Sequence, residues 1–181
     1  GEMLNVPVYP TWNALDVVTS DYKQYGGRIG TYGGAGRNFG IQNSDLLLAI
    51  GSRISGRITG GNIHSFAREA KKIVVDVDQS LLQKKLQQVP FDVNILCDAK
   101  IFLQRMINRL RELEEKSKLP NFSLWTEKCM VWKKKYDPVK KEFFEQKKDV
   151  HPYAFMRTLS DEMAADSILV GDCGGNIVVS N

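Results

Sequence analysis

Three short apolar runs, each ending at an acidic residue, a glycine or a cysteine, constrain the fold of this chain most. They occupy residues 45–51, 72–78 and 93–97. The first two are apolar at consecutive positions, which is typical of parallel strands covered by helices on both faces. Helical patterns follow them at residues 62–70, 80–85 and 99–113. This alternation predicts an α/β domain with a doubly wound parallel sheet over residues 1–113.

The helical pattern at residues 62–70 places four apolar side chains on one stripe, those of Ile63, Phe66, Ala67 and Ala70. The pattern at residues 99–113 is longer and clearly amphipathic. A brief extended run, Val6-Pro7-Val8-Tyr9, precedes the glycine-rich region. We expect the two helical patterns to cover the predicted sheet.

The chain changes character after residue 113. Residues 114–150 are rich in lysine and predict a basic helical linker, with helical stretches at residues 122–132 and 138–148. The net charge of the whole chain is +4, and this stretch carries the surplus. We interpret the lysines as a solvated helix face, because no nucleic-acid-binding motif accompanies them. Nucleic acid is therefore not an expected partner.

Residues 151–181 predict the beginning of a second, truncated α/β unit. His151-Pro152 indicates the start of a helix, since proline fits the first helical turn. Phe155, Leu159 and Met163 are expected to face inward from this helix. Ile168-Leu169-Val170 then predicts a new strand, followed by a glycine turn.

Composition narrows the setting. The chain has 181 residues, 43% hydrophobic and 25% charged, as in a globular protein. Its three cysteines and two histidines lack disulfide or zinc spacing, so we expect a cytoplasmic protein without a structural metal. No apolar run is long enough to span a membrane. The chain begins with glycine rather than methionine, so we expect an excised fragment.

A glycine cluster at residues 30–40 suggests a phosphate-binding loop but fails the dinucleotide fingerprint. Gly34, Gly36 and Gly40 are spaced G-x-G-x-x-x-G instead of G-x-G-x-x-G, and no strand directly precedes them. Two interpretations stay open. The small residues around Gly33 can let main-chain N–H groups face an anion, or the segment is a flexible turn.

Polar side chains follow the predicted strands at their carboxyl ends, where open parallel sheets bind ligands. Arg53 and Arg57 follow the first strand after Gly51, Asp76-Val77-Asp78 ends the second, and Asp98 follows the third. An arginine pair and carboxylates on neighbouring strands suit the pyrophosphate and ribose of a nucleotide. Alternatively, the arginines pair with Asp76 or Asp98 and only hold loops together. No nucleophile, general base or metal triad can be assembled, so no catalytic or metal-binding residue is assigned.

Three segments together resemble a known family. The runs NSDLLLAIGSRISGRITG (43–60), KKIVVDVDQSLLQK (71–84) and LCDAK (96–100) resemble the central domain of thiamine diphosphate-dependent enzymes of the acetolactate synthase type. The segment 5–17 is similar to the family's Pro-Val strand and threonine turn, and residues 151–176 to the start of its diphosphate-binding domain.

The resemblance implies a partial protein without the catalytic glutamate and the magnesium-binding segment, and therefore without activity of its own. It implies FAD, or another adenine nucleotide, at Gly33 to Gly36, Arg53, Arg57, Asp76 to Asp78 and Asp98, and contact of Gly174, Gly175 and Asn176 with thiamine diphosphate. Ser55 and Gly56 stand where the family tends to carry an acidic pair between the arginines.

The function implied is that of an enzyme using thiamine diphosphate and Mg²⁺ to decarboxylate a 2-oxo acid and ligate the product to an acceptor carbonyl. A 2-oxo acid decarboxylase or oxidase, or a non-catalytic nucleotide-binding or scaffold domain, is the alternative. The implied whole protein is a homodimer or homotetramer acting on small 2-oxo acids away from membranes, whereas the fragment alone can be monomeric.

Overall fold

The computed structural model describes residues 1–83 and 87–180. The chain divides into two compact units, Gly1–Lys135 and Tyr136–Asn181. Among the described residues, no helix combines the length and the apolar character needed to cross a membrane.

A three-stranded parallel sheet forms the centre of the first unit. Its strands β1 (Leu46–Ile50), β2 (Lys71–Asp76) and β3 (Val93–Leu96) lie in the order β1-β2-β3. Leu48 pairs with Ile73, and Val75 pairs with Ile95. The three predicted strands are therefore confirmed. They form because each apolar run is long enough for a short buried strand and ends in a turn.

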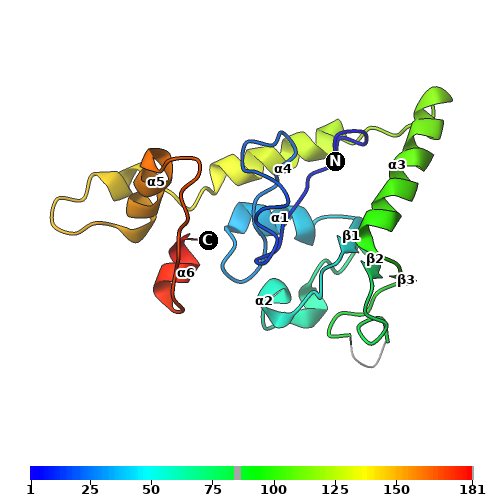
Figure 1. Cartoon of the computed structure of the whole chain (residues 1–181), viewed down its shortest axis with the longest axis horizontal. Coiled ribbons are helices and arrows are strands. Elements are labelled where there is room, and N and C mark those ends of the chain that lie inside the picture. The colour runs from blue at the N-terminus through cyan, green and yellow to red at the C-terminus, as the bar shows by residue number, and fades with distance from the viewer. Residues whose placement is uncertain (84–86, 181) are drawn as a thin grey trace. The chain divides into compact units, whose positions relative to one another are not determined.

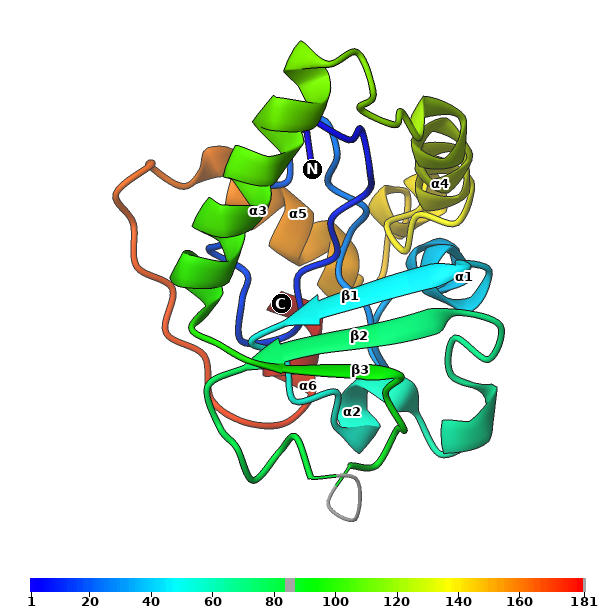
Figure 2. The same ribbon diagram turned by 90° about the vertical axis from the view of Figure 1, so that its right-hand side faces the viewer.

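Helices cover both faces of this sheet. Figure 1 shows α1 (Ala35–Gln42) and α2 (Gly56–Thr59) on one side of the strands and α3 (Ala99–Glu115) on the other. Figure 2 shows the three strands side by side and pointing the same way. The predicted doubly wound α/β class is confirmed.

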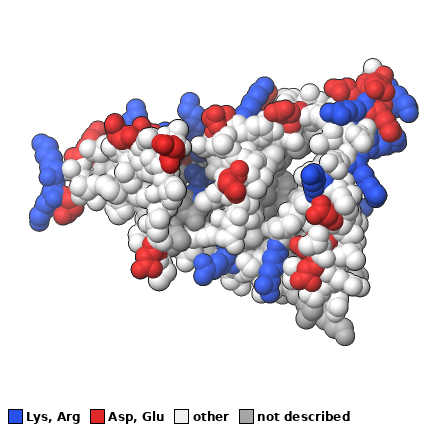
Figure 3. Space-filling model, viewed as in Figure 1, with Lys and Arg blue, Asp and Glu red and all other residues white. Residues whose placement is uncertain are grey.

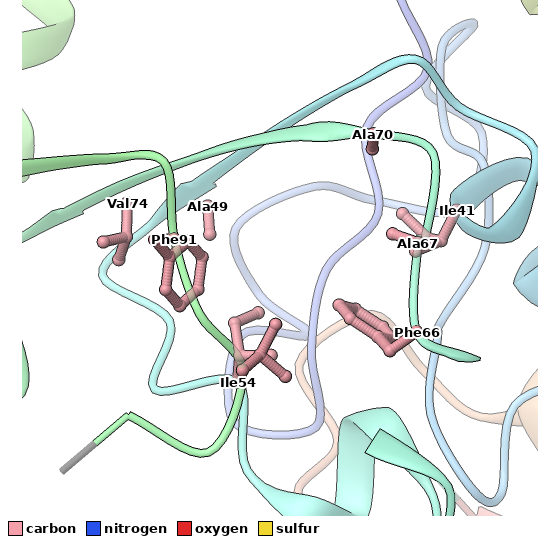
Figure 4. Close-up of a cluster of buried hydrophobic side chains, with 9 residues drawn as sticks. Ile41, Ala49, Ile54, Phe66, Ala67, Ala70, Val74 and Phe91 are labelled. Atoms are coloured by element: carbon pink, nitrogen blue, oxygen red, sulfur yellow. The ribbon is translucent and has the colours of Figure 1, made fainter. Parts of the chain in front are cut away.

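The core lies between the sheet and the side that carries α1 and α2. Ala49 of β1 and Val74 of β2 are register partners and face it together. Ile54, Phe66 and Phe91 reach the same cluster from loops (Figure 4). Burial of these side chains is the main stabilising term of the unit, at about 1.5–3 kcal/mol for each large one.

The prediction of a helix at residues 62–70 is wrong, but the prediction of which side chains are buried there is largely confirmed. Only a 3-10 turn, η1 (Ile63–Ser65), is present. Ala67 has φ 44°, a left-handed conformation that ends any right-handed helix. Phe66, Ala67 and Ala70 are nevertheless buried as the apolar stripe predicts. Of the helical piece predicted at residues 80–85, Ser80 to Gln83 form turns and residues 84 and 85 lie outside the described residues.

The amphipathic helix predicted at residues 99–113 is confirmed as α3, which continues to Glu115. Asp98 caps its N-terminus by accepting hydrogen bonds from the main-chain N–H groups of Lys100 and Ile101. No residue of α3 is fully buried, and the Ile101 side chain remains 46% exposed. The sheet therefore covers only part of the apolar face of α3.

The predicted linker contributes a helix to the first unit. Helix α4 (Ser123–Lys135) packs against α1, so this unit extends beyond the expected boundary at residue 113. The contact includes an edge-to-face pair of Phe39 and Trp132. Of the helical stretch predicted at residues 138–148, only a 3-10 turn, η2 (Lys141–Phe144), forms, and it belongs to the second unit.

The second unit contains α5 (Pro152–Glu162) and α6 (Gly175–Ser180). Pro152 opens α5 as predicted, and the His151 Nδ1 atom accepts a hydrogen bond from the Tyr153 N–H group. The prediction that Phe155 faces inward is wrong, because its side chain is 54% exposed and Ala154 is buried instead. The predicted strand at Ile168-Leu169-Val170 is also wrong. These residues have no strand assignment, and no strand for them to pair with exists among the described residues of the unit.

Charged side chains of both signs are interspersed on the face shown in Figure 3. The last turn of α4 carries Lys133, Lys134 and Lys135 next to the negative end of the helix dipole, which stabilises the helix. A local structural role thus accounts for part of the lysine surplus.

Candidate functional site: the carboxyl ends of the parallel strands

The strands place the predicted site residues along one edge of the sheet. Gly51 follows β1, Asp76 ends β2 and Asp98 follows β3. The Gly51 N–H group donates to the Val75 carbonyl oxygen at 2.8 Å, and the Cys97 N–H group donates to the Asp76 carbonyl oxygen at 3.0 Å. These bonds continue the ladder beyond the strands and fix the main chain from which the site residues extend.

Three carboxylates at this edge also hold their own loops. Asp76 is buried, and its Oδ1 accepts from the Asp78 N–H group at 2.9 Å. Asp78 Oδ1 accepts from both the N–H group and the hydroxyl of Ser80, at 2.8 and 2.6 Å. The Ser80 hydroxyl is the main cause that lowers the pKa of Asp78, and the charge of Arg53 adds to it. Asp98 is the α3 cap, and Val77 between the first two acids is 65% exposed.

The two arginines do not form the ion pairs that the alternative interpretation requires. Among residues 1–83 and 87–180, the arginines within 4.0 Å of a carboxylate are Arg68, Arg109 and Arg157. The charge of Arg53 contributes to the lowered pKa of Asp78, and no ion pair within 4.0 Å joins Arg53 to Asp76 or Asp98. In the described part of the chain, neither guanidinium group is therefore held by a carboxylate.

The glycine segment reaches the arginine loop through main-chain contacts. The N–H group and the hydroxyl of Thr31 both donate to the Arg57 carbonyl oxygen, at 2.8 and 2.9 Å. Gly30, with φ 117°, comes so close that a Cβ atom there would lie 2.6 Å from the same oxygen. The Asn38 side chain of α1 both donates to and accepts from the main chain of Gly30, each at 3.1 Å. Residues 30 and 31 are thus held firmly beside α2.

The predicted glycines divide between two roles. Gly34 is the N-cap of α1 and supplies no side-chain cap, so the first N–H groups of the helix are left for water or a ligand. A Cβ atom at Gly33 would lie 2.7 Å from the Arg28 carbonyl oxygen, so this position serves a tight turn. Gly36 is buried against the main chain of Trp132 and serves the contact of α1 with α4.

The strand-end residues fit a nucleotide in their chemistry. The Ser52 hydroxyl is buried and has no hydrogen-bond partner in the described part of the protein, and it directly follows Gly51. Gly51 has φ 58° and open space where a side chain would stand. Among residues 1–83 and 87–180, a hydroxyl without a hydrogen-bond partner and two arginines without an ion pair, with carboxylates at the next strand end, are groups of the kinds that bind phosphate and ribose.

A small pocket lies between the glycine segment, α1 and α2. Its volume is about 100 Å³, and its walls include Gly30, Thr31, Asn38 and the segment 58–60. Sites for whole ligands usually measure about 300–1,000 Å³. This pocket is therefore too small to hold a whole nucleotide.

The residues predicted to contact thiamine diphosphate do not form a site within the second unit. Gly174 and Gly175 are exposed, and Asn176 lies in the first turn of the short helix α6. The Asp172 carboxylate accepts a hydrogen bond from the next residue's N–H group. No group of three or more His, Cys, Asp or Glu side chains gathers among the described residues as a metal site would require. These residues alone do not fit a Mg²⁺-diphosphate group, and no chemical step is assigned to them.

Comparison with known proteins agrees with the α/β fold of the first unit. Residues 1–106 match the family described as "Thiamine pyrophosphate enzyme, central domain". The chain therefore belongs to the thiamine pyrophosphate enzyme family, and this portion is its central domain.

Acetolactate synthases are among the similar proteins. The chain is 35% identical to a probable acetolactate synthase large subunit of Methanococcus aeolicus over 76% of its own length and 23% of that protein. It is 30% identical to the probable large subunit of Methanocaldococcus jannaschii over 97% of its length and 29% of that protein. It is 31% identical to chloroplastic acetolactate synthase 2 of Nicotiana tabacum over 93% of its length and 24% of that protein. The chain thus spans about a quarter of the length of these curated relatives.

Proposed function

We propose that this chain is part of a thiamine diphosphate-dependent enzyme that decarboxylates a 2-oxo acid and joins the product to an acceptor carbonyl. The observation that carries the proposal is the similarity to acetolactate synthases over nearly the whole chain, together with the central-domain match. Thiamine diphosphate with Mg²⁺ would supply the carbanion chemistry when bound, and the protein would position it.

Within that enzyme, the first unit holds FAD or another adenine nucleotide at the strand ends. Arg53 and Arg57 neutralise the pyrophosphate, and the Ser52 hydroxyl donates to one of its oxygens. The carboxylates of Asp76 and Asp78 accept hydrogen bonds from ribose hydroxyls. This role is binding and positioning, and none of these residues is assigned a step in bond making or breaking.

The expected partners follow from the family. Small 2-oxo acids are the substrates, and the whole enzyme is a homodimer or homotetramer working in the cytoplasm. The apolar side chains that remain exposed on α3, such as Ile101 and Ile107, are compatible with further protein packing against this helix.

Titration of the purified chain with FAD tests the nucleotide site. We expect flavin absorbance to co-elute with the protein in gel filtration, and Arg57→Gln to weaken binding on the order of tenfold, because a charge-assisted contact contributes about 1.5–3 kcal/mol. Arg68→Gln is the matched control, since Arg68 lies outside the strand ends and pairs with Glu69 on the surface. Equal binding by both variants contradicts the proposed role of Arg57.

A scaffold domain with a vestigial nucleotide site is the second candidate. The small pocket and the use of three carboxylates in local hydrogen bonds favour it. Absence of FAD and ADP binding to the chain at high micromolar concentration would support this candidate. Formation of acetolactate from pyruvate by the complete protein tests the enzymatic part of the proposal separately.

A further inference from the structure

Two aromatic side chains from distant parts of the sequence meet beside the glycine segment. The rings of Trp12 and Tyr32 have centroids 5.7 Å apart and planes inclined by 58°. Neither ring belongs to the hydrophobic core, and Tyr32 is 53% exposed. Tyr32 is therefore an exposed aromatic side chain, in contact with the half-buried Trp12, and its free surface is available to bind a flat ring.

The pair is tied to the arginine loop through one residue. Thr31, which precedes Tyr32, donates two hydrogen bonds to the main-chain oxygen of Arg57. The Asn38 side chain holds the main chain of Gly30 by two more. Tyr32 therefore extends from a segment whose position relative to α2 is fixed before any ligand binds, which lowers the entropic cost of binding.

The chemistry of this corner differs from that of the strand ends. The strand ends offer guanidinium groups, a hydroxyl and carboxylates, all suited to phosphate and sugar. The corner at Trp12 and Tyr32 offers aromatic faces, on which every heteroaromatic base can stack. A nucleotide carries both kinds of group on one molecule.

We propose that Trp12 and Tyr32 bind the planar heteroaromatic ring of the nucleotide whose phosphates contact Arg57. The inference rests on the proposed nucleotide-binding function and adds the residues that hold the ring. It assigns Tyr32 the exposed stacking surface and Trp12 the side chain that supports it from the N-terminal segment.

Binding of three ligands to the 181-residue chain by isothermal titration tests this inference. The ligands are ADP, FMN and inorganic pyrophosphate, so adenine, isoalloxazine and phosphate are examined separately. We expect Tyr32→Leu to weaken binding of ADP, FMN or both on the order of tenfold, since stacking on an aromatic side chain contributes about that much. Tyr32→Phe, which keeps the ring, should bind within about twofold of the wild type.

Pyrophosphate binding should be the same in all these variants. Trp12→Phe and Trp12→Leu form a second matched pair. If the ligand quenches tryptophan fluorescence in the wild type but not in Trp12→Phe, the ligand ring lies at Trp12. Since Tyr32 is exposed, Tyr32→Leu keeps the test decisive where Trp12→Leu fails to fold. A larger effect on ADP identifies adenine as the stacked ring, and a larger effect on FMN identifies isoalloxazine.

Two results would overturn the inference in distinguishable ways. Equal binding of ADP and FMN by Tyr32→Leu and the wild type, with weaker binding by Arg57→Gln, rejects the aromatic site and leaves the proposed function intact. Failure of the wild-type chain to bind ADP, FMN and pyrophosphate rejects the proposed nucleotide site and the ring site with it.

Discussion

Gly36 of α1 lies directly against the main-chain carbonyl of Trp132 in α4, at a position that a Cβ atom would overlap. Gly40, one turn later on the same face, is similarly enclosed by Tyr9 and the Cys129 thiol. Both positions require glycine, because α4 and Tyr9 leave no space for a Cβ atom there. Gly36 and Gly40 of the glycine cluster therefore serve packing between α1 and α4 rather than a ligand loop.

Gly36→Ala should destabilise the first unit. The added methyl group meets main-chain atoms, which cannot rotate away, so the two helices must separate at a cost of about 1–3 kcal/mol. Gly61→Ala is the matched control, because nothing lies within 4 Å of a Cβ at Gly61. Urea unfolding followed by circular dichroism measures both. Equal midpoints for the two variants would show that the α1–α4 contact adjusts freely.

The sequence predicts the sheet well because its strands carry local signals. Apolar runs ending in Gly51, Asp78 and Cys97 specify both the strands and the edge where polar side chains gather. The role of Gly36 is not local, since Trp132 lies almost 100 residues later. Its spacing of four from Gly40 is the one signal that indicates a helix-packing face.

The predicted strand at Ile168-Leu169-Val170 shows a different limit. A strand is stabilised by hydrogen bonds to neighbouring strands, and an apolar run without a partner does not form one. Ile168 and Val170 are each 87% exposed in the second unit. Local propensity therefore identifies a segment able to pair but does not determine whether it is paired. The contact between Trp12 and Tyr32 was likewise not predicted from the sequence, because only the fold brings these two residues together.

Gln42 compensates for the break that ends the predicted helix near Ala67. Its Oε1 atom accepts a hydrogen bond from the Ala67 N–H group at 2.9 Å, and Ala67 is completely buried. Gln42→Ala should therefore cost about 1–3 kcal/mol, the penalty for a buried donor left without a partner. Gln42→Glu, which keeps an acceptor, should lose less. Denaturant unfolding distinguishes the two, and equal losses would indicate that packing, not the hydrogen bond, sets the cost.

Asp98 caps α3 in the absence of any ligand, so its substitution should change stability. Asp98→Ala removes the acceptor for two N–H groups of α3 and should cost about 1 kcal/mol, whereas Asp98→Asn caps equally well and should be near neutral. Thermal unfolding measures this difference. Nucleotide affinity that falls in Asp98→Asn while stability is unchanged would assign the carboxylate a separate binding role. A loss of stability in both variants alike would contradict the capping role.

The buried pair Tyr9 and Cys129 should make the first unit less stable at alkaline pH. Burial raises the pKa of the Tyr9 hydroxyl, with a hydrogen bond to Cys129 as a further cause, and burial also raises the pKa of the Cys129 thiol. Both groups are neutral when protonated, so the folded state keeps protons that the unfolded chain releases. Their contribution is complete below the unfolded pKa values, about 8.5 for cysteine and 10 for tyrosine, and is lost as pH rises above them.

The free energy of unfolding should fall by about 1.4 kcal/mol per pH unit for each group that titrates. Urea unfolding between pH 7 and 11 measures this slope. The slope should be shallower than that of the wild type above pH 10 in Tyr9→Phe, and shallower from about pH 8.5 in Cys129→Ala, because each variant lacks one of the two titrating groups. Slopes equal to that of the wild type in both variants would place the alkaline sensitivity elsewhere.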